Sequence, residues 1–143
     1  MKSKNLIVIY ILTLLLTISC KEEKKAAIEI SQMQKVMAVH DEVMPKMGTL
    51  SRLVAKLKSK VDTTLTGREN EKAMKDLQDA NKAMMDWMVN FGDRFDSDEI
   101  LNGKALNSEK QQWLNEEEKK IMEVRDQING SIEKAKTLLK EEN

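Results

Sequence analysis

Residues 33–61, MQKVMAVHDEVMPKMGTLSRLVAKLKSKV, carry the pattern that decides the fold. Core-type residues recur there at alternating spacings of three and four, at Met33, Val36, His40, Val43, Met47, Leu50, Val54, Leu57 and Val61. A seam sustained over about four heptads is typical of a helix that packs along its whole length. Pro45 lies inside the seam, lacks a backbone donor and crowds the carbonyl of Asp41. Because the seam continues in phase beyond Pro45, we expect one kinked helix.

Two further seams predict two more helices, over residues 69–91 and 109–141. The first of these seams consists of Ala73, Leu77, Ala80, Met84, Trp87 and Phe91. The second consists of Leu114, Glu117, Ile121, Val124, Ile128, Ser131, Ala135 and Leu138. Glu117 and Ser131 are polar and weaken that last seam, which leaves open an amphipathic helix that is exchanged with a partner coiled coil.

The segments between the seams contain turn and capping signals. Residues 62–68 read as a turn, Gly92 is expected to end the second helix, and residues 93–107 form an acidic, solvated connection. Ser108 and Gln111 match a capping box at the start of the third helix. The sequence therefore predicts an all-α, up-down-up three-helix bundle with long, coiled-coil-like helices and a kink at Pro45.

The N-terminus has the features of a secretion signal that ends at a lipid-attachment site. Lys2 and Lys4 precede an uncharged apolar run over residues 6–18, which is short for a membrane-spanning helix. The stretch LTISC at residues 16–20 resembles the lipobox of bacterial lipoproteins, with Thr17 at the position where Leu is usual. A plain secretory signal or an N-terminal anchor helix is the alternative interpretation.

The lipobox resemblance implies that residues 1–19 are a removed signal peptide and that Cys20 is lipidated. Residues 20–25 then form a short charged tether to a single helical domain at 26–143. Two acyl chains anchor a protein stably in a membrane. We therefore expect a lipid-anchored protein of a bacterial cell envelope, on the periplasmic face or at the cell surface.

Composition excludes several classes of function. The chain has 24 basic and 24 acidic residues, and loss of Lys2 and Lys4 with the signal leaves 22 basic ones. This slightly acidic balance argues against a nucleic-acid partner. Cys20 is the only cysteine, so no internal disulfide is possible. The single histidine and the lack of a Glu-x-x-His pair or a strained nucleophile turn lead us to expect no enzymatic activity.

Methionines gather on the first two predicted helices. One group surrounds the only histidine and the other surrounds a tryptophan; together they comprise Met33, Met37, His40, Met44, Met47, Met74, Met84, Met85, Trp87 and Met88. A hairpin centred near residue 65 sets residues whose numbers sum to about 130 at one level, so the two groups would meet.

Thioether and imidazole ligands select Cu(I), and the chemically similar Ag(I), over harder ions. The predicted ligands are Met37, His40, Met44, Met84 and Met88, with Trp87 as a cation–π cover. The ligand types resemble those of periplasmic copper and silver chaperones. The alternative is that the methionines are flexible core fillers around Pro45 and that His40 is an ordinary core residue.

The segments HDEVMPKM at 40–47 and AMMDWM at 83–88, behind a lipoprotein signal, resemble small envelope lipoproteins of flavobacteria. Some of these are labelled viral A-type inclusion protein repeats. The resemblance implies no activity. We expect a membrane-anchored, non-enzymatic protein-interaction or structural module, with a protein partner or self-association through its helices. The alternative is a Cu(I)- or Ag(I)-binding protein.

Overall fold

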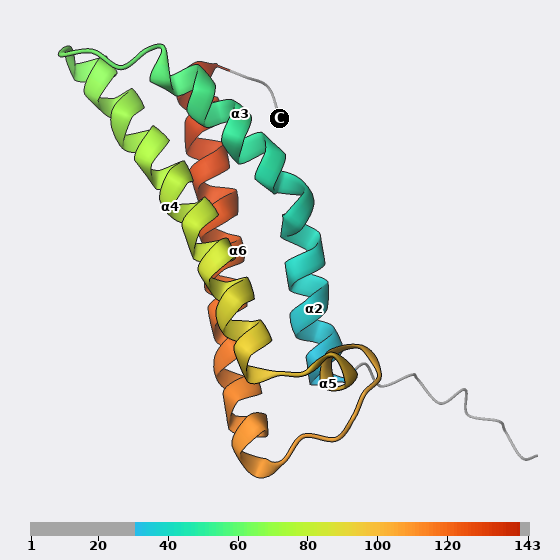
Figure 1. Cartoon of the computed structure of the whole chain (residues 1–143). Coiled ribbons are helices and arrows are strands. Elements are labelled where there is room, and N and C mark those ends of the chain that lie inside the picture. Colours follow the sequence, from blue (N-terminus) through green and yellow to red (C-terminus); the bar gives the residue numbers. More distant parts are fainter. Residues whose placement is uncertain (1–30, 141–143) are drawn as a thin grey trace, which may run out of the picture.

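The computed structural model describes residues 31–140, which form helices joined by short connections and contain no β-strand. The elements, in chain order, are α2 (Gln32–Val43), η1 (Met44–Lys46), α3 (Met47–Lys58), α4 (Leu65–Arg94), α5 (Ser97–Leu101) and α6 (Ser108–Leu139) (Figure 1). The predicted signal peptide, the lipidation site Cys20 and the tether at 20–25 lie outside the described residues.

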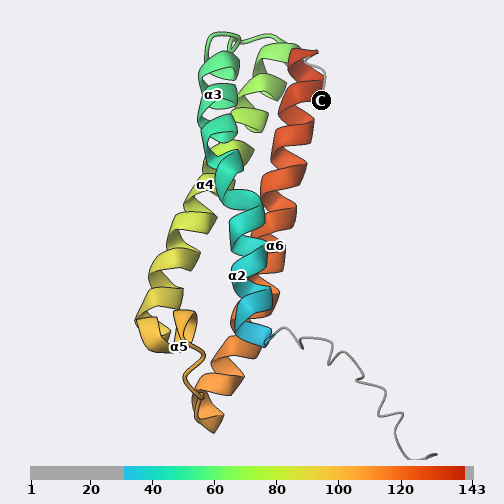
Figure 2. The same cartoon turned by 90° about the vertical axis from the view of Figure 1, so that its right-hand side faces the viewer.

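The three long segments run up, down and up, as predicted. α2 and α3 rise together, α4 descends beside α3, and α6 rises again along both (Figures 1 and 2). α4 packs against α3 and α6, whereas α2 packs mainly against α6. α2 and α4 therefore diverge toward the end at which α5 lies. We call the half of the bundle that contains α5 the lower half. The half that contains residues 59–64 is the upper half.

The predicted kink at Pro45 is confirmed, and it takes the form of the single 3₁₀ turn η1. A 3₁₀ turn advances by about 120° per residue instead of about 100°, so it rotates the helix that follows it. Leu53 is fully buried, whereas the predicted core residue Val54 is half-buried and Val61 is 38% exposed. The predicted seam was wrong at Val54 because of this added rotation, and it was wrong at Val61 because α3 ends at Lys58, before that residue.

The second helix begins earlier than predicted. The side chain of Thr64 accepts a hydrogen bond from the backbone N–H of Gly67 at 3.0 Å, and Asp62 accepts one from the N–H of Thr64 at 2.8 Å. This cap starts α4 at Leu65, inside the segment that we predicted as a turn. A Cβ atom at position 67 would overlap Asp62, so the turn requires glycine there.

Two further helix ends differ from the predictions. α4 continues through Gly92 to Arg94, because Phe91 and Phe95 are both buried on its inner face and hold this turn against the bundle. α6 is capped by Asn107, whose side chain accepts from the N–H of Lys110 at 2.8 Å. The predicted capping box at Ser108 is therefore wrong by one residue.

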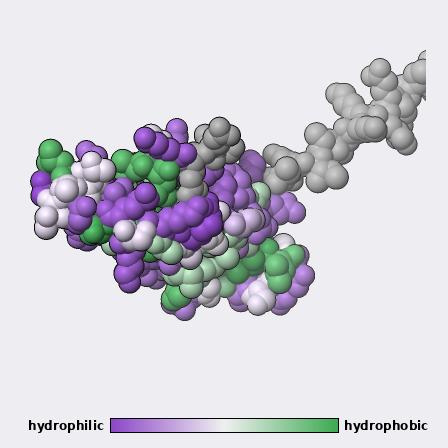
Figure 3. All heavy atoms as spheres, turned by 90° about the horizontal axis from the view of Figure 1, so that it is seen from above, coloured by the Kyte–Doolittle hydropathy of each residue, from purple (hydrophilic) through white to green (hydrophobic). Residues whose placement is uncertain are grey.

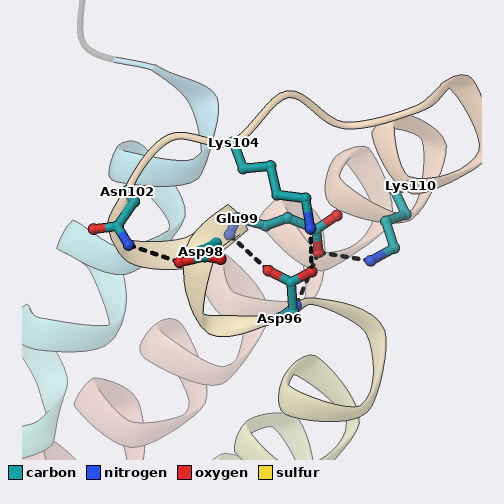
Figure 4. A network of polar contacts seen from close by, with 6 residues as sticks. All are labelled: Asp96, Asp98, Glu99, Asn102, Lys104 and Lys110. Carbon is teal, nitrogen blue, oxygen red and sulfur yellow. Dashed lines mark hydrogen bonds and ion pairs between the residues drawn. The ribbon is translucent and has the colours of Figure 1, made fainter.

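The connection between α4 and α6 contains the short helix α5, which the sequence analysis missed (Figure 4). Asp96 caps α5, and the buried Glu99 accepts a hydrogen bond from Lys110 of α6 at 2.6 Å. Lys104 binds Asp96 at 2.8 Å. The Lys110 ammonium holds the pKa of Glu99 below its ordinary value, and Lys104 does the same to the pKa of Asp96. The predicted solvated connection therefore contains a network of hydrogen bonds and ion pairs that holds α5 against α6.

The seams of the second and third helices form the core. Fully or almost fully buried are Ala73, Leu77, Ala80, Met84, Trp87 and Phe91 of α4, and Leu114, Glu117, Ile121, Val124, Ile128, Ser131 and Ala135 of α6. Leu138 is half-buried. Ser131 is accommodated because its hydroxyl donates to the carbonyl of Ile128 at 3.0 Å. The polar residues of the third seam thus lie inside the bundle.

Candidate functional site

The candidate site begins with three side chains of the first rising segment. Met37, His40 and Met44 are spaced by three and four residues, so they lie on successive turns of one helix edge. The backbone N–H of Met44 donates to the carbonyl of His40, which extends the helical turn up to Pro45. All three side chains are half-buried, and both methionines pack against the core. This edge of α2 therefore presents sulfur on both sides of the only histidine.

α4 supplies the other residues of the predicted metal site. Trp87 is 4% exposed, and Met88 beside it is half-buried and packs against the core. Met84 is 0% exposed and belongs to the core itself. The five predicted ligands are thus divided: Met37, His40, Met44 and Met88 lie at the margin of the core, and Met84 lies within it.

His40 and Trp87 join the two helices across the divergence between them. Their ring centroids are 5.7 Å apart and their planes are inclined by 30°. The hairpin arithmetic placed His40 level with residues 88–91, so the observed level differs from it by less than one turn. The side chain of His40 retains 17% of its accessible surface.

The imidazole of His40 is oriented by a carboxylate. Its Nδ1 lies 2.9 Å from Oδ1 of Asp41, and this is the only hydrogen bond of the ring to any residue of the 31–140 segment. With Nδ1 donating to the carboxylate, the lone pair of the neutral ring resides on Nε2. The nitrogen that is free to act as a ligand is therefore Nε2.

Aromatic rings fill the widened lower half. Trp87 stacks on Phe91 with centroids 4.7 Å apart, and Phe91 lies 4.9 Å from Phe95. The three residues recur every four positions on α4, and His40 continues their row from α2. These large side chains bridge the space that smaller residues would leave between α2 and α4.

Two buried polar atoms near this row have no hydrogen-bond partner among the described residues: Nε1 of Trp87 and Oε2 of Glu117. Glu117 is 0% exposed, and its other oxygen, Oε1, accepts a hydrogen bond from Lys120 at 2.8 Å and forms an ion pair with Arg94 at 3.0 Å. Trp87 and Glu117 both line a groove of about 310 Å³ between α4 and α6. The only sequence signal for this feature was a glutamate on an apolar seam.

Arg94 connects the same region to the bundle surface. It donates to Glu116 at 2.8 Å, and its guanidinium lies 5.5 Å from the ring centroid of Trp113. The Arg94 charge holds the pKa of Glu116 below its ordinary value. Arg94 thus joins α4 to the first turns of α6 through two carboxylates and one aromatic ring.

Apolar side chains are exposed on the flank of α4 that faces away from the α4–α6 groove. Ala83, Asp86 and Asn90 line that groove, and about 100° per residue places Met85, Met88 and Val89 on the other flank. Met85 is 49% exposed and Val89 is 62% exposed. Figure 3 shows the molecule from above, and on that face hydrophilic and hydrophobic residues are mixed.

A site for a hard metal ion would need carboxylates or imidazoles that converge. Between residues 31 and 140, no group of three or more His, Cys, Asp or Glu side chains is placed to hold a metal ion.

No family model, curated protein or solved structure matches the chain.

Proposed function

We propose that the protein is a lipid-anchored, non-enzymatic module of a bacterial envelope that binds an amphipathic helix of a protein partner. The binding surface is the methionine face, which we define as Met37 and Met44 of α2 together with Met85, Met88 and Val89 of α4. The observation that carries the proposal is the exposure of Met85 and Val89, at 49% and 62%, one turn apart beside half-buried methionines.

The chemistry of the methionine face favours binding of a helix. Unbranched thioether side chains adapt to differently shaped apolar partners, and such surfaces are typical of proteins that capture amphipathic helices. The face combines two turns of α2 with one turn of α4, and its members range from half-buried to exposed. A cluster of exposed apolar side chains on a soluble domain is typical of an interaction site.

The anchor in this proposal rests on the sequence alone. Among residues 31–140 no helix is both long and apolar enough to cross a bilayer. In this proposal, lipidation at Cys20 supplies the membrane attachment. α2 begins at the lower end of the bundle, so this is the end that follows Cys20 in the chain (Figure 1).

Site-specific photo-crosslinking in intact cells tests both parts of the proposal. A photoreactive side chain at Val89 should give one adduct of discrete mass, and Met85→Lys should abolish it. The same group at Leu65, which is 77% exposed at the upper end, is the matched control and should give no adduct. The Cys20→Ala variant should leave the membrane fraction and lose the adduct.

Three results would count against the proposal. An adduct at Leu65 equal to that at Val89 would show contact without a preferred face. An adduct of twice the protein's own mass would show that a second copy of the chain, and not another protein, occupies the methionine face. A Cys20→Ala variant that is processed and remains with the membrane as strongly as the parent would remove the anchor.

A further inference from the structure

We infer that His40, together with the thioethers of Met37, Met44 and Met88, forms a binding site for a soft monovalent cation, Cu(I). This inference concerns a function separate from the docking of a helix, although the two share Met37 and Met44 of α2 and Met88 of α4. It rests on the placement of the ligands, on the hydrogen bond that orients the histidine, and on the ring that covers it.

The histidine is held as a metal-binding histidine usually is. Such residues donate their second ring N–H to a carboxylate or carbonyl, which fixes the tautomer and strengthens the ligating nitrogen. Asp41 accepts from Nδ1 of His40 at 2.9 Å and so directs Nε2 to act as the ligand. The side chain of Asp41 is 73% exposed, so this orienting carboxylate can be replaced without opening the core.

Sulfur is available on both sides of the imidazole. Met37 and Met44 lie one turn before and one turn after His40, and Met88 lies next to Trp87 on the facing helix. All three methionines are half-buried, so their unbranched side chains have room to turn toward a common ion. One nitrogen and up to three thioethers form a ligand set that favours Cu(I) over harder divalent ions.

Trp87 gives the site its cover. Its ring contacts His40 and is 4% exposed, so one side of the site is apolar and shielded from water. An aromatic face also attracts a cation directly, and this attraction is stronger where water is excluded. Met84 is not part of the site, because its side chain is enclosed in the core.

Titration of the full-length chain in detergent micelles with Ag(I) tests the inference, because Ag(I) shares the ligand preference of Cu(I) and is stable in air. Every protein compared carries Cys20→Ser, since a free thiol would outcompete thioethers for the ion, and the buffer contains no chloride. His40 is the only histidine, so its imidazole NMR signals report on the site without assignment. We expect saturation at one equivalent with a shift of these signals.

Fluorescence supplies a second readout. The chain contains two tryptophans, Trp87 and Trp113. Bound Ag(I) should quench the emission of a Trp113→Phe variant, in which Trp87 is the remaining fluorophore. The matched Trp87→Phe variant emits from Trp113. Its emission should not fall along the saturation curve seen for Trp87.

Substitutions then separate ligands from packing. Asp41→Asn lies on the surface and should lower the affinity by about 10- to 100-fold, the usual effect of a group that orients a ligand. His40→Gln should lower the affinity by at least this factor. Met44→Leu keeps nearly the same volume, so a loss of affinity there reports on sulfur. Met85→Leu and Met122→Leu, outside the site, should bind as the parent does.

Several outcomes would overturn the inference. These are an absence of saturable binding at micromolar Ag(I), binding that leaves the His40 signals unmoved, and equal affinities for Asp41→Asn, Met44→Leu and the parent. Because Asp41 is exposed, its variant tests the site even if His40→Gln fails to fold. Loss of the Val89 adduct with retention of Ag(I) binding would refute only the helix-docking function, and the converse result would refute only the metal site.

Discussion

The upper and lower halves of the bundle are built from the same three helices but are packed differently. Aliphatic and small residues fill the upper half, among them Leu53, Leu57, Leu77, Ala73 and Ala135. Large rings and buried charges occupy the lower half, where α2 leaves α4 and packs on α6. Both unpartnered buried polar atoms, on Trp87 and Glu117, also lie toward the lower half. Residues that depart from the packing most favourable for stability are typical of functional regions. We therefore expect the functional residues to lie in the lower half.

The largest expected effect comes from truncating one leucine in each half. Leu77→Ala, in the upper half, should lower the free energy of unfolding. The loss should lie near the top of the range of about 2 to 5 kcal/mol that is usual for core leucines, because the close neighbours of Leu77 cannot collapse into the cavity. Leu114→Ala, in the lower half, should lower the free energy of unfolding by an amount near the bottom of that range, because α2 and α4 diverge there and leave its neighbours more room to relax. Urea unfolding followed by circular dichroism measures both losses. Equal losses, or a larger loss for Leu114→Ala, would contradict the difference in packing between the two halves.

A second substitution should have the opposite sign. Glu117→Met removes a buried carboxylate with one unpartnered oxygen, while Arg94 keeps its contact with Glu116. Arg94 and Lys120 both reach solvent, so neither is left as a buried, unpaired charge. The free energy of unfolding should rise by about 1 to 3 kcal/mol. Glu116→Met, at an exposed position one residue away, is the control and should leave stability close to that of the parent. Destabilisation by Glu117→Met would mean that the buried ion pair supports the lower half.

The smallest effect is local and depends on pH. The pKa of Glu99 is lower in the folded protein than its ordinary value of 4.5, chiefly because Lys110 binds it. The ionised form is therefore favoured by folding, and this stabilisation is present above pH 4.5 and is lost as the pH falls through the folded-state value. Amide hydrogen exchange should show α5 opening on acidification before the upper half does. A Glu99→Gln variant should lack this pH dependence, and simultaneous opening of both halves in the parent would contradict the prediction.

The sequence predicted the architecture because apolar periodicity is a property of each helix by itself. It placed the second and third seams correctly, including the polar members Glu117 and Ser131. It failed at Val54, where the rotation introduced by η1 could not be read from spacing. It also missed α5, whose five residues are too few to show a period and which is held by Lys110 from another helix.

The candidate site was predicted in part. Simple hairpin arithmetic brought His40 to within one turn of its observed level beside Trp87. Arithmetic could not show that Met84 is enclosed while Met88 remains at the margin, because this depends on the divergence of α2 from α4. The orienting contact from Asp41 was also missed, because spacing alone does not show that two adjacent side chains on a helix bend toward each other.

The opposite placement of the two described chain ends has a mechanical consequence. Ser31 lies at one end of the bundle and Lys140 at the other, and α2, α3 and α6 all run in the same direction (Figure 2). α6 alone, with 32 residues, is about 48 Å long at 1.5 Å per residue. A tensile load between these ends acts parallel to the helix axes, so it must slide α2 and α3 along α6 and break their side-chain contacts together. It does not peel them apart one turn at a time. The bundle is thus arranged to resist tension along its length better than tension across it.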